Sequence, residues 1–239
     1  MIDLNIPIIE MRNISKRYSI KHRKESLRET NLKITQKGII GLIGPNGAGK
    51  STFLKLIAGL IKPSGGNINV LGKPVSRLIS KQLAFLPEVD SLYGFMKIRD
   101  MLNFMHATFP NFNLQKSQNI LKDLKLDPDK YVYELSKGNR ARLKICLCLS
   151  RDVPIILLDE PLSGLDPMMR ENILRDLVQY TDLENQTLLI SSHEVQEIEP
   201  FLDYIIFLKE GKVYSFDEAE ALRIEHHKSI YQIMKEVYA

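Results

Sequence analysis

The sequence predicts an α/β protein built around a mostly parallel sheet. From Pro154 onward, apolar runs of strand length alternate with segments of helical spacing, which is typical of strand–helix–strand units. A glycine-rich loop at 44–52 directly follows the apolar run 39–43 and leads into a helical pattern. The stretch 95–134 has helical periodicity and no buried-strand run. We therefore expect a layered sheet with a helical segment inserted in the chain.

The N-terminal part is expected to be rich in β-structure. Residues 8–43 contain short strand-like stretches, among them 8–11 and 31–34. Between these two, residues 19–29 are rich in Lys and Arg and are expected to form a loop or the tip of a hairpin. Such a run is more typical of a solvated charge cluster than of a binding site.

The later elements follow from periodicity and turn residues. A helix is expected over about 50–60, a turn at the Lys-Pro-Ser-Gly-Gly sequence 62–66, and a strand with a glycine turn at 68–73. A helix is also expected over 140–149. The remaining predictions are strand 154–158, helix 167–180, strand 187–191, helix 194–199, strand 203–208, a turn at Gly211, strand 213–216 and a helical tail over 217–239.

Composition indicates one globular domain. The chain has 239 residues, of which 44% are apolar and 26% charged, as in ordinary globular proteins. Its net charge of +4 is too small to indicate a nucleic-acid partner, so none is expected. No apolar run reaches the roughly 18 residues of a membrane helix, and the N-terminus does not resemble a signal peptide. Cys146 and Cys148 would point to different helix faces, which favours a reducing, cytoplasmic location.

The glycine-rich loop has the sequence pattern of a phosphate-binding loop, G-x-x-x-x-G-K-S, after a strand and before a helix. Without Cβ atoms, its backbone can curl and direct successive N–H groups at a phosphate chain. Lys50 can reach the β- and γ-phosphates, and the Ser51 hydroxyl can ligate Mg²⁺. The alternative, a glycine-rich turn that binds nothing, is the minor interpretation. Nucleotide contacts are expected from Gly44, Pro45, Asn46, Gly47, Ala48, Gly49, Lys50, Ser51 and Thr52.

A pair of acids ends the next buried strand. The apolar run 153–158 lacks alternation, as in a strand covered on both faces, and it leads into Asp159 and Glu160. Carboxylates at this end of a parallel strand lie at the rim where open α/β sheets bind ligands. Asp159 suits Mg²⁺ coordination through a water, and Glu160 is placed to accept a proton from an attacking water. The alternative is that both acids cap the following helix.

Three further segments occur in a specific order: Leu-Ser-Lys-Gly-Asn at 135–139, Ser-Gly-Leu-Asp at 163–166 and Ser-Ser-His at 191–193. With them, the chain resembles the nucleotide-binding subunits of ABC transporters over about residues 8–216. In this resemblance, the loop 44–52 corresponds to Walker A, 155–160 to Walker B with the catalytic Glu160, 136–139 to the ABC signature, 163–166 to the D-loop and His193 to the switch histidine.

The resemblance implies an ABC-type P-loop NTPase core with a mostly parallel sheet, an N-terminal antiparallel β part and an inserted helical subdomain. It further implies a single ABC ATPase domain over 1–239. Within it, 1–94 and 135–216 would form the catalytic core, 95–134 the helical subdomain and 217–239 a C-terminal helical tail.

Two positions before the signature carry further expectations. Tyr18 matches the family's aromatic residue that stacks on adenine, although an ordinary surface tyrosine is the alternative. The Q-loop glutamine is replaced by Glu88, an acceptor-only carboxylate that is expected to ligate Mg²⁺. The alternative for Glu88 is that it points away and merely links the core to the helical segment.

The signature departs from the family pattern at Lys137 and Asn139 and keeps Ser136 and Gly138. In the family, this serine and the glycine-lined helix start bind the γ-phosphate from across a dimer. The departures resemble those of bacterial subunits that pair with separate membrane proteins, some of which export peptides or antibiotics.

The resemblance therefore implies an ATPase with ATP and Mg²⁺ as cofactors and with Lys50, Glu160 and His193 as catalytic residues. Two partners are implied: a second ABC ATPase chain, identical or different, bound head-to-tail around two ATP molecules, and an integral membrane permease subunit that the dimer drives. The chain would lie in the cytoplasm, on the inner face of the cell membrane, held there by its permease. The permease would determine which substrate is transported, and the direction would be export.

Two other classes are the alternatives. One is a soluble ABC ATPase acting on ribosomes or DNA, but such chains usually carry two cassettes or a long coiled-coil insertion, and neither is present here. The other is a cassette that binds ATP as a weakly hydrolytic clamp. The presence of Lys50, Asp159, Glu160 and His193 argues against the clamp.

Overall fold

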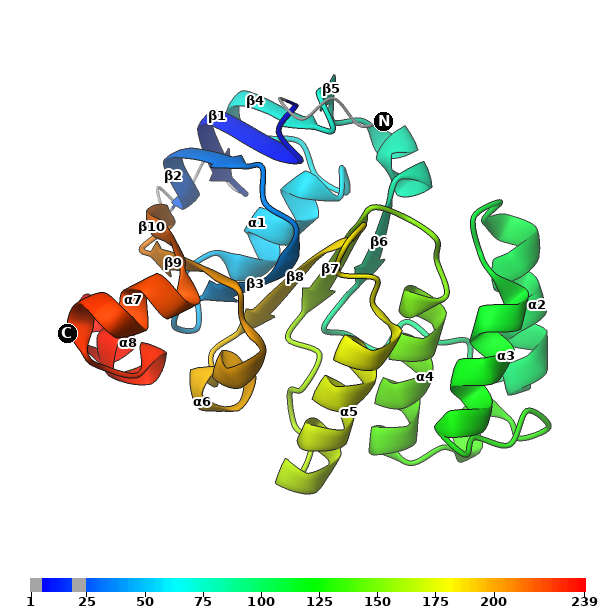
Figure 1. Ribbon diagram of the computed structural model, residues 1–239. Helices are drawn as coiled ribbons and strands as arrows, with labels where there is room; N and C mark the ends of the chain where they lie inside the picture. The colour runs from blue at the N-terminus through cyan, green and yellow to red at the C-terminus, as the bar shows by residue number, and fades with distance from the viewer. Residues whose placement is uncertain (1–5, 19–24) are drawn as a thin grey trace.

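A six-stranded sheet forms the centre of the computed structural model, which describes residues 6–18 and 25–239 (Figure 1). Its strand order is β10-β9-β3-β8-β7-β6, and every neighbouring pair is parallel except β9 and β10. The predicted α/β class with a mostly parallel sheet is therefore confirmed. The strands are β3 (Gly38–Ile43), β6 (Leu83–Leu86), β7 (Ile155–Asp159), β8 (Thr187–Ser192), β9 (Tyr204–Lys209) and β10 (Lys212–Glu218).

A second, antiparallel sheet confirms the predicted N-terminal β part. Its order is β2-β1-β4-β5, formed by β1 (Ile9–Arg17), β2 (Glu25–Ile34), β4 (Gly65–Val70) and β5 (Lys73–Pro74). The loop predicted over 19–29 is wrong for 25–29, which belong to β2, whereas 19–24 lie outside the described residues. Leu27 and Thr30 are both buried although they are three residues apart, because a register shift between β1 and β2 lies between them, and the charged residues between them face solvent.

Helices cover both sides and both ends of the central sheet. In Figure 1, α2 and α3 lie at the β6 end and the tail helices α7 and α8 at the β10 end. The predicted helical tail over 217–239 forms two helices, whereas its first two residues complete β10 and residues 227–229 connect the helices. The helices are α1 (Lys50–Ile57), α2 (Ile98–Thr108), α3 (Leu114–Asp123), α4 (Lys137–Leu149), α5 (Pro167–Tyr180), α6 (Val195–Ile198), α7 (Ala219–His226) and α8 (Ile230–Tyr238), with 3-10 turns at Arg77–Lys81, Val132–Glu134 and Glu199–Phe201.

The central sheet separates two apolar cores. Along β3, Ile39 and Ile43 pack into one core with helices of the 98–238 part, whereas Ile40 and Leu42 pack into the other with α1 and the antiparallel sheet. This alternation is the period of two that a strand imposes on its side chains. Burial on both faces explains why β3, β7 and β8 are almost continuously apolar.

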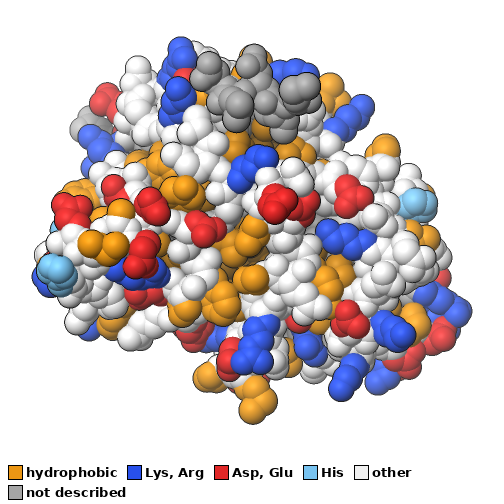
Figure 2. Space-filling model, viewed as in Figure 1, with side chains coloured by type: hydrophobic (Ala, Val, Ile, Leu, Met, Phe, Trp, Pro, Cys, Tyr) orange, Lys and Arg blue, Asp and Glu red, His pale blue; other side chains and the backbone are white. Residues whose placement is uncertain are grey.

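The surface carries mixed charge. Figure 2 shows basic and acidic side chains interspersed over one face, with no single-sign stripe on it. Among the helices that the structure describes, none is long and apolar enough to cross a membrane. The division of the chain into core, helical subdomain and tail at the predicted boundaries stays a prediction.

Candidate functional site

Three parallel strands bring the predicted motifs to one rim of the central sheet. The loop 44–52 follows β3, Glu160 follows β7, and His193 follows β8. A cavity of about 480 Å³ lies at this rim, lined by residues of the loop together with Glu88, Glu160 and His193. Segments more than a hundred residues apart in sequence therefore share one cavity because their strands are neighbours in the sheet.

The glycine-rich loop has the backbone that its sequence predicts. Gly49 has φ 107°, in the left-handed region, and a Cβ there would collide with the carbonyl oxygen of Ser26. Gly44 is as confined, because a Cβ would lie 2.6 Å from the Leu208 carbonyl oxygen. Only glycine satisfies both positions. The loop leads into α1, whose N-terminus lies at the cavity. The first backbone N–H groups of a helix have no partner within the helix and favour an anion there.

Lys50 and Glu160 form an ion pair at the cavity. Lys50 Nζ lies 3.1 Å from Glu160 Oε1 and donates a hydrogen bond to the Gly44 carbonyl oxygen at 2.7 Å. The side chains of Lys50 and Glu160 are only 6% and 10% exposed. The ammonium is thus held at the mouth of the loop, where a phosphate chain would meet it.

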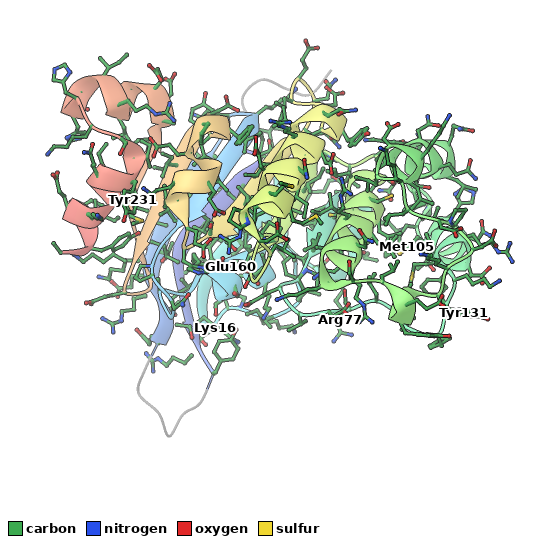
Figure 3. The ribbon with its side chains drawn as sticks, turned by 90° about the horizontal axis from the view of Figure 1, so that it is seen from below. Lys16, Arg77, Met105, Tyr131, Glu160 and Tyr231 are labelled. Carbon is green, nitrogen blue, oxygen red and sulfur yellow. The ribbon has the colours of Figure 1, made fainter. Side chains whose placement is uncertain are left out.

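Glu160 is also held by the third strand. Its other oxygen, Oε2, lies 2.9 Å from His193 Nδ1, and its backbone N–H donates to Ser191 Oγ at 2.9 Å. The residue adopts φ 47°, a left-handed conformation that is uncommon outside glycine and that turns its carboxylate into the cavity. Figure 3 shows Glu160 between the strands and α5, far from Met105 and Tyr131 on the helical side.

The alternative in which Asp159 and Glu160 cap the next helix is wrong. The N-cap of α5 is Asp166, whose carboxylate accepts a hydrogen bond from the Met169 N–H at 3.0 Å. Asp159 is buried instead and accepts from two hydroxyls, Ser51 Oγ at 3.0 Å and Ser191 Oγ at 2.9 Å. Ser191 was not predicted as a site residue, although it lies after the apolar residues of β8 and begins the Ser-Ser-His segment at 191–193.

The oxygens of Ser51 and Asp159 fit Mg²⁺. Both are hard ligands, and they lie side by side next to the loop. Within the described residues, no cluster of three or more His, Cys, Asp or Glu could hold a metal ion by itself. Mg²⁺ is usually bound by one or two protein ligands together with waters and substrate phosphates.

Glu88 lies on the loop after β6 and lines the cavity, so the alternative in which it points away is not favoured. The structure also shows how this loop is held. Lys144 Nζ, from α4, donates to the carbonyl oxygens of Pro87 at 3.0 Å, Glu88 at 3.3 Å and Val89 at 3.2 Å. Burial lowers the pKa of Lys144, and the carboxylates of Asp90 and Glu88 oppose that shift. Lys144 was not predicted; its signal was a lysine within the apolar part of α4.

Tyr18 lies beside the loop rather than inside the cavity. Its hydroxyl is 3.2 Å from Thr52 Oγ1, and 59% of the residue is exposed. The Lys16 ammonium lies 5.2 Å from the centre of its ring. An exposed aromatic face next to the phosphate loop can accept a flat base, which leaves the predicted stacking role open to test.

The structure does not bring Ser136 and Gly138 to this cavity. Ser136 is exposed and caps α4 by accepting from the Asn139 N–H at 3.3 Å. Gly138 packs against Met169, because a Cβ there would lie 2.8 Å from the Met169 Cε. The predicted site residues therefore separate into a group at the cavity and a group at the start of α4.

Comparisons with known proteins agree with this geometry. A family model described as ABC transporter matches residues 27–163. An uncharacterized ABC transporter ATP-binding protein of Methanocaldococcus jannaschii is 33% identical over 219 residues, which are 90% of this chain and 79% of the relative. The petrobactin import ATP-binding protein YclP of Bacillus subtilis is 31% identical over 86% of this chain and 85% of its own length. The lantibiotic transport ATP-binding protein SrtF of Streptococcus pyogenes is 32% identical over 86% and 89%.

The fold is shared with solved cassettes. A dimeric ATP-binding cassette, solved in a post-hydrolysis state with ADP and Pi, aligns with a TM-score of 0.77 and 23% identity over 88% of this chain and 98% of that one. The family match spans more than half of the chain, and the relatives align along most of their lengths. The chain belongs to the ABC transporter family, as one of its ATP-binding and ATP-hydrolysing subunits.

Proposed function

We propose that this ATPase binds ATP in the cavity at the ends of β3, β7 and β8 and drives the export of a substrate through a membrane permease. The observation that carries the proposal is the contact series from Lys50 through Glu160 to His193, which joins three strand ends in one cavity. In this arrangement, one carboxylate is held at both oxygens and directed at the place where the phosphates would lie.

Each side chain has a distinct part. The loop N–H groups and Lys50 hold the phosphate chain, and Tyr18 stacks on the adenine. Glu160 accepts the proton of the attacking water, while His193 fixes the orientation of that carboxylate. Ser51, Asp159 and Glu88 would hold Mg²⁺, which neutralises phosphate charge when bound. Hydrolysis then depends on positioning and charge stabilisation rather than on covalent chemistry of the protein.

The second half of the site would come from another ABC ATPase chain, bound head-to-tail. Ser136 and Gly138 stand at the N-terminus of α4, a 13-residue helix whose dipole favours an anion. Both lie outside the cavity of their own chain. A second chain could present them to the γ-phosphate, and loss of that phosphate on hydrolysis would loosen the dimer.

Export through a permease on the inner face of the cell membrane is the finer part of the proposal. It is supported by the lantibiotic transport relative and by the altered signature, whereas another relative is named as an importer. The substrate would be selected by the permease. The mixed surface charge gives no reason to add a nucleic-acid partner.

Affinity purification from the native membrane tests the proposal. The tagged chain is extracted in detergent with Mg²⁺-ATP, in the wild type and in Glu160→Gln, which should hold the ATP-bound dimer longer. One integral membrane protein should co-purify in stoichiometric amount and be retained better by the variant. A chain that hydrolyses ATP but brings down no membrane protein would favour a soluble ABC ATPase, and a chain that binds ATP without turnover would favour the clamp.

A further inference from the structure

The tail helix α8 contacts the residue that precedes the phosphate loop. The hydroxyl of Tyr238 donates to the Ile43 carbonyl oxygen at 2.8 Å and lies 3.3 Å from the Leu208 carbonyl oxygen. Ile43 is the last residue of β3, and Tyr238 is 195 positions away in sequence. The phenol ring packs edge-on against Phe207, and burial raises the pKa of Tyr238.

The contact of Tyr238 lies where β3 leads into the phosphate loop. The Ile43 carbonyl and the Gly44 N–H share one planar peptide group, so fixing the first orients the second. The Gly44 carbonyl oxygen, in the next peptide group, accepts the hydrogen bond from Lys50 Nζ at 2.7 Å. The Leu208 carbonyl oxygen, the other neighbour of the hydroxyl, is the atom that a Cβ at Gly44 would meet at 2.6 Å. Two successive peptide groups therefore connect the Tyr238 contact to the Lys50 contact.

Both ends of α8 are held by the core. At its start, Glu199 accepts from the backbone N–H groups of Ile230 at 2.8 Å and Tyr231 at 3.2 Å. Glu199 follows the short helix α6, six positions after His193. At its end, Lys209 Nζ donates to the Val237 carbonyl oxygen at 2.5 Å. The helix thus spans from the segment after His193 to the entry of the phosphate loop.

We propose that α8 braces the phosphate loop for ATP binding and that Tyr238 is the positioning residue of this brace. The proposal rests on the placement of ATP at the cavity and is independent of the direction of transport. Tyr238 does not line the cavity; it fixes the peptide between Ile43 and Gly44, and the next peptide along the chain holds the Lys50 ammonium.

The test is Tyr238→Phe, which removes one hydroxyl and keeps the ring. The matched control is Tyr231→Phe on the same helix, because the Tyr231 hydroxyl makes no hydrogen bond within the described residues and its ring rests against Lys235. Loss of one hydrogen bond predicts a Kd and KM for ATP raised about two- to tenfold in Tyr238→Phe, with kcat at saturating ATP unchanged. Tyr231→Phe should match the wild type.

A second measurement separates positioning from general stability. Hydrogen exchange without nucleotide should be faster over residues 44–52 in Tyr238→Phe and unchanged in Tyr231→Phe. A wild-type Kd for ATP in Tyr238→Phe would overturn the brace, even if the melting temperature fell. If the wild type itself failed to bind ATP, the proposed function would fall, whereas exchange at 44–52 would still decide whether Tyr238 holds the loop.

Discussion

The cavity at the strand ends and the start of α4 are built in opposite ways. At the cavity, Lys50, Glu160 and His193 are partnered within one chain, and the first two are almost fully buried. At the start of α4, Ser136 is exposed, and among residues 6–18 and 25–239 the one hydrogen-bond partner of its hydroxyl is the Asn139 N–H of its own helix. The first region holds its charged groups within one chain, whereas the second presents a helix N-terminus, which favours an anion, outside the cavity of its own chain. The proposal of a site shared between two chains accounts for this difference.

The largest expected effect is loss of turnover in Glu160→Gln. The amide keeps the shape but cannot accept the proton of the attacking water, so the rate should fall about 10²–10⁴-fold while ATP still binds. Phosphate release measures the rate, and size-exclusion chromatography with Mg²⁺-ATP should show an accumulated dimer. Glu171→Gln, on the exposed face of α5, is the matched control. Wild-type turnover in Glu160→Gln would remove Glu160 as the base.

Lys50→Ala should weaken nucleotide binding itself. The substitution removes the cation of the cavity and leaves the nearly buried Glu160 carboxylate without its ammonium partner. A charged hydrogen bond contributes about 1.5–3 kcal/mol, so affinity should fall roughly tenfold to a hundredfold. Titration calorimetry measures the loss, circular dichroism checks the fold, and Lys55→Ala on the same helix is the control. An unchanged affinity would refute the assignment of the phosphate loop.

Ser136→Ala should leave the ATP affinity of the single chain unchanged and lower the turnover of the dimer. The single chain keeps its whole cavity, so its affinity for ATP should match the wild type. Turnover at high protein concentration should fall about tenfold, since a hydroxyl contact to a charged phosphate is lost across the dimer. Loss of the N-cap costs about 1 kcal/mol of stability, which a melting curve monitors. A drop in ATP affinity of the monomer would place Ser136 in its own cavity and contradict the proposal.

The smallest expected effect concerns Glu88, at the edge of the cavity nearest to α4. A carboxylate binds Mg²⁺ well but repels the γ-phosphate when the metal is absent. Glu88→Gln should therefore reduce the dependence of hydrolysis on free Mg²⁺ without abolishing activity. Rates measured across a Mg²⁺ titration decide this, and superimposable curves for the two forms would show that Glu88 is not on the metal side.

The cavity was predictable because its residues follow strands buried on both faces. The continuous apolar runs before Gly44 and Asp159 mark both the strands and their ends. The fold was less predictable where a charged segment or a very short segment forms a strand. The charged segment at 25–29 forms part of β2 because Leu27 alone faces inward there, and β6 has only four residues before Pro87.

The supports of the site could not be predicted. Lys144 and Tyr238 act through backbone carbonyls of Glu88 and Ile43. Every residue has a backbone carbonyl, so the sequence does not show which carbonyls will accept a hydrogen bond from a side chain. Periodicity and motif spacing do not relate positions that meet only in the folded chain. The tail helix in particular was predicted as a helix without any link to the phosphate loop.

Mixing two variants that carry their defects in different halves of the site tests the shared site most directly. Lys50→Ala has a defective cavity and an intact α4 start, and Ser136→Arg has the reverse defect. In a mixed dimer, one of the two sites combines the intact cavity of one chain with the intact Ser136 of the other. ATP hydrolysis by the equimolar mixture should therefore exceed the sum of the two separate variants at the same total protein concentration. A mixture that shows only that sum, over a range of concentrations at which the wild type is active, would contradict a site completed by a second chain.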